Sequence, residues 1–179
     1  MVLDNAMVSG DAIVYESARI SDSARIYDEA YVYGSANVSY NALVYGNASV
    51  HDNALIMDTA WVHGYAEVAN NAIIANEAQV FENAKVFGDA SVYGNATVYG
   101  KARVQGNAIL YGRTDVSGLV QVGGNTKISG RAKLSDRAVV YGKAKVFGNT
   151  SICDSAYVCG ESKLYDSAKV YGNARVVDA

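Results

Sequence analysis

Proline is absent from the 179 residues, and only two cysteines and two histidines are present. With no Pro-rich linker and no charged or Gly/Ser-only tract to mark a boundary, we expect one domain over residues 1–179. No apolar run approaches the ~18 residues that a membrane-spanning helix needs. The first residues carry no basic side chain ahead of an apolar run, as a signal peptide would. These absences predict a soluble, cytoplasmic protein without a membrane partner.

What the sequence has instead is one six-residue unit, repeated in phase without insertion or deletion. Counted in sixes, positions 6 to 174 are alanine in 24 of 29 cases, and positions 2 to 176 are Val, Ile or Leu in all 30. Sixteen of the 17 glycines lie two places after that aliphatic residue. A period of six excludes an α-helix, whose period is 3.6 residues.

The spacing within the unit predicts short strands separated by turns. Alanine and the aliphatic residue are two places apart, so on a strand both point inward. The Gly and Asn that follow tolerate positive φ, so the chain turns there. Three bends close a triangle of about 18 residues, and such coils stack at the parallel-strand spacing of ~4.8 Å. We therefore predict an all-β, triangular parallel β-solenoid of about ten coils, with no inserted loop and no capping helix.

The unit at residues 92–96, Val-Tyr-Gly-Asn-Ala, resembles the motif of the hexapeptide-repeat family. The resemblance covers the whole chain and implies that family's single-stranded, left-handed parallel β-helix. One departure is that an aromatic residue often follows the aliphatic one, as at Tyr45 and Phe87, where the family has a small or acidic residue. This variant resembles a Val-Tyr-Gly-Asn-Ala subgroup whose members are commonly labelled transferases.

Histidine and cysteine are the residues of this chain that we consider for catalysis, metal binding and disulfide formation. Many hexapeptide-repeat proteins are trimeric acyltransferases with a catalytic histidine, so the resemblance implies His63 and His51 as candidates. The alternative is that each histidine simply replaces the tyrosine of the repeat. The family's zinc sites take three histidines, so two per chain predict no metal. Cys153 and Cys159 fall on different sides of the coil, too far apart for a disulfide, and we expect free thiols.

Residues 18 apart stack in columns, which makes the outer surface readable from the sequence. Two adjoining faces combine apolar and aromatic columns, and contiguous exposed apolar surface predicts an interface. The predicted interface residues are Leu43, Tyr45, Leu55, Met57, Trp61, Ile73, Phe81, Tyr93, Tyr99, Ile109 and Tyr111. The alternative is that the aromatic rings stack on one another as ladders at the corners, and both interpretations can hold. The third face is more polar, with opposite charges as neighbours at Glu67 and Lys85.

Charge is divided between the two halves of the chain. Residues 1–90 carry 3 basic and 12 acidic side chains, which gives −9, and residues 91–179 carry 12 basic and 6 acidic, which gives +6. Lys127, Lys145 and Lys163 share one column, where like charges at ~4.8 Å repel each other. We predict that these lysines face an acidic partner, the alternative being a solvated face. Because the chain as a whole is acidic, nucleic acid is not the expected partner.

The least regular stretch is residues 113–126. Thr114, Val120 and Thr126 replace all three alanines of one coil. We expect a slightly wider coil there, and the alternative is a junction between two modules.

Three functions are compatible with these patterns. We favour a non-catalytic solenoid without a cofactor, which acts by assembly or by binding a macromolecule through its flat faces. Its partner would be a protein or further copies of the chain, as a trimer, a dimer or an end-to-end stack through unpaired strand edges. The second function is an acyltransferase that uses an acyl-CoA-type donor between subunits, with His63 or His51 as general base. The third is an inhibitor that binds another protein, with the acidic half mimicking nucleic acid.

Overall fold

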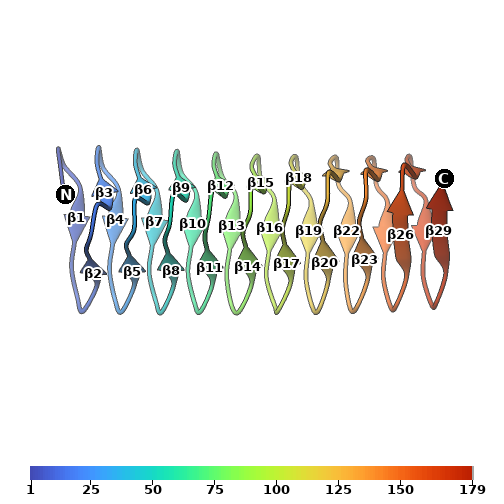
Figure 1. Cartoon of the computed structure of the whole chain (residues 1–179), viewed down its shortest axis with the longest axis horizontal. Coiled ribbons are helices and arrows are strands. Elements are labelled where there is room, and N and C mark those ends of the chain that lie inside the picture. Colours follow the sequence, from blue (N-terminus) through green and yellow to red (C-terminus); the bar gives the residue numbers. More distant parts are fainter. Residues whose placement is uncertain (179) are drawn as a thin grey trace.

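The structure is a computed structural model that describes residues 1–178. Within those residues the chain forms 29 short β-strands joined by turns, and no helix. Figure 1 shows the coils stacked along the long axis of the molecule, from the N-terminal end at the left to the C-terminal end at the right. The predicted all-β solenoid of about ten coils is confirmed, and across the described residues it has neither an inserted loop nor a capping helix.

Every third strand pairs in parallel, so that three parallel sheets form the three sides of a prism. Sheet A contains β3 (Arg19–Ile20), β6 (Asn37–Val38), β9 (Leu55–Ile56), β12 (Ile73–Ile74), β15 (Ser91–Val92), β18 (Ile109–Leu110), β21 (Lys127–Ile128), β24 (Lys145–Val146) and β27 (Lys163–Leu164). Sheet B contains β1 (Met7–Val8), β4 (Arg25–Ile26), β7 (Leu43–Val44), β10 (Trp61–Val62), β13 (Gln79–Val80), β16 (Thr97–Val98), β19 (Asp115–Val116), β22 (Lys133–Leu134), β25 (Ser151–Ile152) and β28 (Lys169–Val170). Sheet C contains β2 (Ile13–Val14), β5 (Tyr31–Val32), β8 (Ser49–Val50), β11 (Glu67–Val68), β14 (Lys85–Val86), β17 (Arg103–Val104), β20 (Gln121–Val122), β23 (Val139–Val140), β26 (Tyr157–Gly160) and β29 (Arg175–Asp178).

The register between strands is constant along the prism. Each strand residue pairs with the residue 18 places further on, as Trp61 does with Gln79 in sheet B and Ile73 with Ser91 in sheet A. Sheet A is extended at its N-terminal edge by a parallel bridge between Val2 and Ile20. The predicted columns are therefore confirmed, and a side chain's position in the repeat determines which face it occupies.

The inward positions form one continuous core. Every aliphatic residue from Ile20 to Val158 is fully buried, and so is the residue two places before it, which is alanine in most repeats. Burial of a Val, Ile or Leu side chain contributes about 1.5–3 kcal/mol, so this column is the main stabilising interaction. Each coil also donates backbone hydrogen bonds to the next, as from the Asn95 amide to the Gly112 carbonyl at 2.7 Å. Each coil is thus stabilised by its neighbours, as in other solenoids.

Each turn begins with a residue in the left-handed region of φ. The sixteen repeat glycines lie at φ 66–80°, and thirteen other residues occupy the same position at φ 55–62°. Twelve of those thirteen are Asp, Asn or Glu, and the exception is Tyr40. We expected positive φ at Gly and at the following Asn alike, whereas the second turn residue, such as Asn95, is not left-handed. One left-handed residue per turn is enough to close the corner.

The coil that contains residues 113–126 continues all three sheets without a break. Asp115 pairs with Thr97 on one side and with Lys133 on the other. Thr114, Val120 and Thr126 are at most 1% exposed. The hydroxyls of both threonines lack a hydrogen-bond partner among the described residues.

Among the residues that the structure covers, there is no helix of the length and apolarity needed to cross a membrane.

Candidate functional site

Aromatic side chains at the corners stack along the prism as ladders. The longest ladder has ring centroids 4.6–5.0 Å apart and interplanar angles of 1–4°. It consists of Tyr27, Tyr45, His63, Phe81 and Tyr99. The ring spacing matches the ~4.8 Å between parallel strands, so the backbone itself brings the rings into contact. The prediction that aromatic side chains stack at the corners is confirmed.

Both histidines are members of these ladders. His63 lies between Tyr45 and Phe81, with ring centroids 4.6 Å and 5.0 Å away. Burial between those rings lowers the pKa of His63 below its usual value. His51 stacks on Tyr33 at 4.8 Å in a second ladder. Each histidine therefore replaces a tyrosine of the repeat, and a role of either as a general base stays a prediction.

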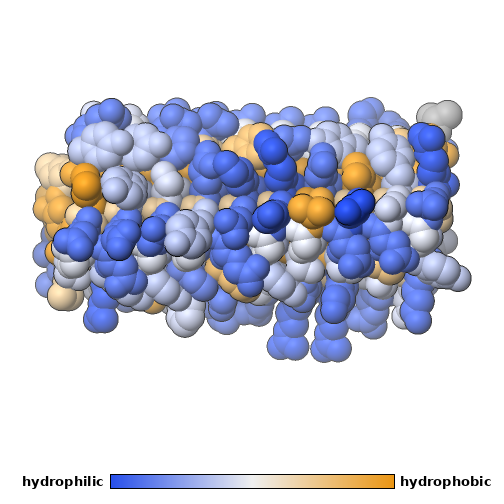
Figure 2. Space-filling model, turned by 90° about the horizontal axis from the view of Figure 1, so that it is seen from below, coloured by the Kyte–Doolittle hydropathy of each residue, from blue (hydrophilic) through white to orange (hydrophobic). Residues whose placement is uncertain are grey.

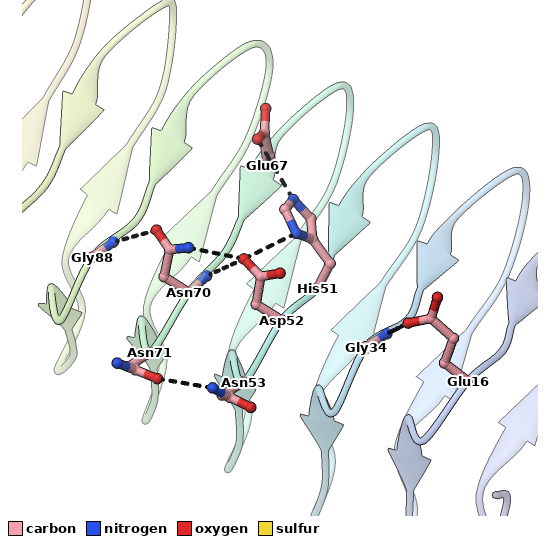
Figure 3. Close-up of polar contacts among 9 residues, drawn as sticks. All are labelled: Glu16, Gly34, His51, Asp52, Asn53, Glu67, Asn70, Asn71 and Gly88. Carbon is pink, nitrogen blue, oxygen red and sulfur yellow. Dashed lines mark hydrogen bonds and ion pairs between the residues drawn. The ribbon is translucent and has the colours of Figure 1, made fainter.

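His51 is also the centre of a polar cluster on sheet C (Figure 3). Its Nδ1 lies 3.4 Å from Asp52 Oδ2, and its Nε2 lies 3.5 Å from Glu67 Oε1. Glu67 is in turn bonded to Lys85, with 2.5 Å between Oε2 and Nζ. This hydrogen bond from Lys85 is the main reason why the pKa of Glu67 is lowered. Opposite charges are neighbours here, as the sequence predicted.

A chain of side-chain hydrogen bonds runs from coil to coil through the turns. Asp52 Oδ2 accepts the backbone N–H of Asn70 at 3.0 Å, and Asn70 Oδ1 accepts the backbone N–H of Gly88 at 3.2 Å (Figure 3). The same bond joins Asp4 to Asp22, Glu16 to Gly34, Asp22 to Tyr40, Asp28 to Gly46, Asp58 to Asn76, Asn76 to Gly94, Asp136 to Asp154 and Asp154 to Gly172. The sequence analysis did not predict that these side chains link neighbouring coils. The signal was present, because Asp, Glu or Asn often takes the place of Gly at the first turn position.

Because turn carboxylates accept these hydrogen bonds, we expect the protein to lose stability in acid. Replacing one carboxylate by an amide should make that loss smaller. The N–H bonds from Asn70 and Asp154 are the main causes that lower the pKa of Asp52 and Asp136 in the folded protein. Their stabilisation is complete above the unfolded pKa of about 3.9 and is lost as the pH falls through the lower folded value. Asp136→Asn keeps the acceptor without titrating, so its free energy of unfolding should fall less steeply between about pH 4 and pH 2.

Urea unfolding at several pH values measures this slope. As a control, Asp11→Asn removes a carboxylate from the second turn position. If both variants lose stability in acid as steeply as the parent chain, the coil-to-coil bond of Asp136 is not the cause.

The lysine column lies on sheet A. Lys127 pairs with Lys145, and Lys145 pairs with Lys163, so three exposed ammonium groups occupy consecutive strands. Lys143, on the adjoining turn, is bonded to Glu161 at 2.8 Å. A cleft of about 260 Å³ lies between these side chains, lined by Lys143, Lys145, Glu161 and Lys163. In the same sheet the column continues towards the N-terminus through Ile109, Ser91, Ile73 and Leu55, and ends with Asn37 and Arg19.

The predicted apolar interface is less exposed than the sequence suggests. Of its eleven residues only Trp61, at 39%, and Tyr111, at 40%, are exposed, and the other nine are half-buried. For Tyr45, Phe81, Tyr93 and Tyr99 stacking contributes to this, because each ring in a ladder covers the faces of its neighbours. The side of the molecule in Figure 2 is mostly hydrophilic, with small hydrophobic patches and a larger group at the N-terminal end. Binding at these residues stays a prediction.

Both cysteines are free, as expected, and Cys153 belongs to an acidic cluster. The potential ligand atoms of Asp136, Cys153 and Asp154 lie within 4.8 Å of one another. Both carboxylates, however, accept the backbone N–H of the next coil. Burial and the nearby carboxylates raise the pKa of the Cys153 thiol. Coil-to-coil bonding accounts for the cluster, and the absence of a metal stays a prediction.

The fold defines this chain as a parallel β-solenoid repeat protein. A family model described as the YdcK beta solenoid repeat matches residues 90–106. The matched segment covers about one coil, including β15 and β16. No curated protein matches the chain.

Proposed function

We propose that this protein is a non-catalytic scaffold that binds an acidic polypeptide along sheet A. The observation that carries this proposal is the register that places Lys127, Lys145 and Lys163 on consecutive strands. Like charges at that spacing destabilise a sheet unless an opposite charge faces them. Glu161 lies beside the column and is bonded to Lys143, and the charges of Lys145 and Lys163 also help to lower its pKa, so one carboxylate is shared among three lysines. An acidic partner would relieve the repulsion within the column.

The rest of the column favours a polypeptide over nucleic acid. Towards the N-terminus the lysines are preceded by Ile109, Ser91 and Ile73, which are half-buried and mostly apolar. A nucleic acid would find three cations and then an apolar strip, whereas a polypeptide can carry acidic and apolar side chains in turn. From Leu55 to Lys163 the column spans six strand spacings, roughly 29 Å. An α-helix of about 19 residues has the same length.

A helix also matches the spacing of the column. Successive turns of an α-helix rise about 5.4 Å, close to the ~4.8 Å between strands. Acidic side chains at positions i, i+4 and i+7 of a helix would therefore meet three consecutive lysines. Apolar side chains at equivalent positions of its other half would meet Leu55, Ile73 and Ile109. The proposed partner is thus an amphipathic helix that is apolar in one half and acidic in the other.

A fluorescently labelled helical peptide of this design tests the proposal. We expect binding that weakens with salt, and the triple variant Lys127→Gln/Lys145→Gln/Lys163→Gln should lower the affinity about tenfold, since three charge pairs are lost. The matched control is Lys101→Gln/Lys133→Gln/Lys169→Gln, which changes the net charge equally but alters sheet B and its adjoining turn. A second peptide with lysine in place of glutamate should not bind.

Three results would contradict this function. Equal loss in both triple variants would show that net charge alone attracts the peptide. Tighter binding of single-stranded DNA than of the peptide would point to nucleic acid instead. No binding of the acidic peptide at low salt would remove the proposal altogether. Light scattering of the chain alone measures its mass in solution. A mass above that of one chain would indicate that a second copy, through its acidic half, binds where the peptide would.

A further inference from the structure

We propose that a cleft at Ala69 binds the purine base of a nucleoside. The cleft has a volume of about 230 Å³ and lies on sheet C and its following corner, away from the lysine column. Its lining includes His51, Glu67, Ala69, Lys85 and Phe87. It lies where an aromatic ladder lacks a ring, and the polar groups at its edges suit a heteroaromatic ligand.

The missing ring follows from the order of residues in the column. Tyr15, Tyr33 and His51 stack with ring centroids 4.8–4.9 Å apart. Ala69 holds the next position, and Phe87 holds the one after it. Two strand spacings, roughly 9.6 Å, therefore separate the corner positions of His51 and Phe87. A planar ring midway between them would lie at the same spacing as the rings of the ladder.

The outer faces of both flanking rings are already covered, so a ligand could stack on these rings only from the side of Ala69. Tyr33 covers His51 from the preceding coil, with an interplanar angle of 9°. The Arg103 guanidinium, from the following coil, lies 5.4 Å from the centroid of Phe87. Ala69 itself lines the cleft and is 4% exposed, so the side chains around it already cover most of its surface. A base inserted there would stack on both sides, an interaction that proteins use to hold nucleobases.

The same column contains a second gap, which the protein closes with its own ring. Gln105 lies 18 residues after Phe87, and Gly123 lies 18 residues after Gln105, so Gly123 directly follows Gln105 in the column. A Cβ placed on Gly123 would lie 2.6 Å from Cζ of Tyr141, whose ring therefore covers the glycine. The Tyr141 hydroxyl accepts a hydrogen bond from the Gln105 amide across this gap. The Ala69 gap, by contrast, remains open as a cleft.

The rim of the cleft offers both donors and acceptors. Asp52 uses Oδ2 for its hydrogen bonds to Asn70, which leaves Oδ1 as an acceptor. Lys85 donates to Glu67 and has two further protons. A purine presents acceptor nitrogens and, in adenine, an amino donor on its edges. Two carboxylates and the cations Lys85 and Arg103 give the rim no net charge, which favours an uncharged nucleoside over a phosphorylated one.

Calorimetric titration with adenosine tests the cleft. Ala69→Tyr supplies the missing ring and should weaken adenosine binding at least about tenfold, because the base loses its place in the stack. The matched control is Ala75→Tyr, the same substitution at the same repeat position of another corner, between Met57 and Tyr93. This control should bind adenosine like the parent chain. Far-UV circular dichroism verifies that both variants fold.

A second variant keeps the test decisive if Ala69→Tyr does not fold. Phe87→Leu preserves an apolar side chain but removes one stacking face, so adenosine should again bind more weakly. The proposal is overturned if the parent chain does not bind adenosine, or if Ala69→Tyr and Ala75→Tyr bind it equally well. Tighter binding of N-acetyl-tryptophanamide than of adenosine would also overturn it, and would assign the cleft to an aromatic side chain of a partner protein.

Discussion

Replacing Gly148 by alanine is expected to lower the free energy of unfolding by about 2–4 kcal/mol. Gly148 is the first residue of a turn and has φ +80°, where a side chain is strained. A Cβ there would also lie 2.5 Å from the carbonyl oxygen of Asp166 and 2.9 Å from its nitrogen in the next coil. To make room, the two coils would have to move apart. That movement would stretch the hydrogen bond of 2.6 Å from the Asn149 amide to the same Asp166 carbonyl.

The variant Gly172→Ala separates the cost of backbone strain at positive φ from the cost of crowding against the next coil. Gly172 has φ +66°, and no atom lies within 4 Å of the position that a Cβ would take. This control should therefore lose only the conformational part, about 1–2 kcal/mol. Urea unfolding followed by circular dichroism measures both variants, and hydrogen exchange at the Asn149 amide reports the local separation. Equal losses at the two glycines would refute the idea that crowding between coils matters.

Removing two buried hydroxyls is expected to stabilise the protein. Thr114 and Thr126 lie in the bore, and neither Oγ1 has a hydrogen-bond partner among the described residues. A buried polar group without a partner costs about 1–3 kcal/mol, and valine has nearly the same shape. The double variant Thr114→Val/Thr126→Val should therefore raise the free energy of unfolding by about 2–4 kcal/mol.

Thr150 offers the matched control for this gain. It is also fully buried at an alanine position, but its Oγ1 donates to the Phe147 carbonyl at 2.7 Å. Thr150→Val removes a satisfied bond and should lower the free energy of unfolding by about 0.5–1.5 kcal/mol. The same chemical change is thus expected to have opposite signs at the two places. A loss of stability in the double variant would mean that its hydroxyls are satisfied in solution.

The sequence alone was enough to predict the solenoid. Alanine, the aliphatic residue and the turn glycine recur in phase over the whole chain, and each has a local preference that does not depend on distant contacts. Because no residue is inserted or deleted, one coil length determines every pairing, as between Ile73 and Ser91. For that reason the sequence was enough to predict which residues share a column, which aromatic rings can stack at the corners, and that three lysines are neighbours on sheet A.

The contacts between side chains in neighbouring coils could not be predicted in the same way. The carboxylate of Asp52 reaches the amide of Asn70 only because the first turn residue is left-handed and points its side chain along the prism. The exposed fraction of the predicted interface also depended on stacking, since a ring covered on both faces is not available to a partner. Such details depend on the direction of each side chain, which composition does not encode.

The two gaps in the sheet C ladder show which features cannot be predicted from the sequence. From the sequence, Ala69 and Gly123 are equivalent interruptions of one column of rings. In the structure Tyr141 covers Gly123, whereas the cleft at Ala69 is lined by His51 and Phe87 and stays open. The sequence by itself determined the repeat, the register and the residues of each face, because these follow from local preferences summed at a constant period. Only the tertiary structure decided which gap remains a cleft, because that depends on how neighbouring side chains pack.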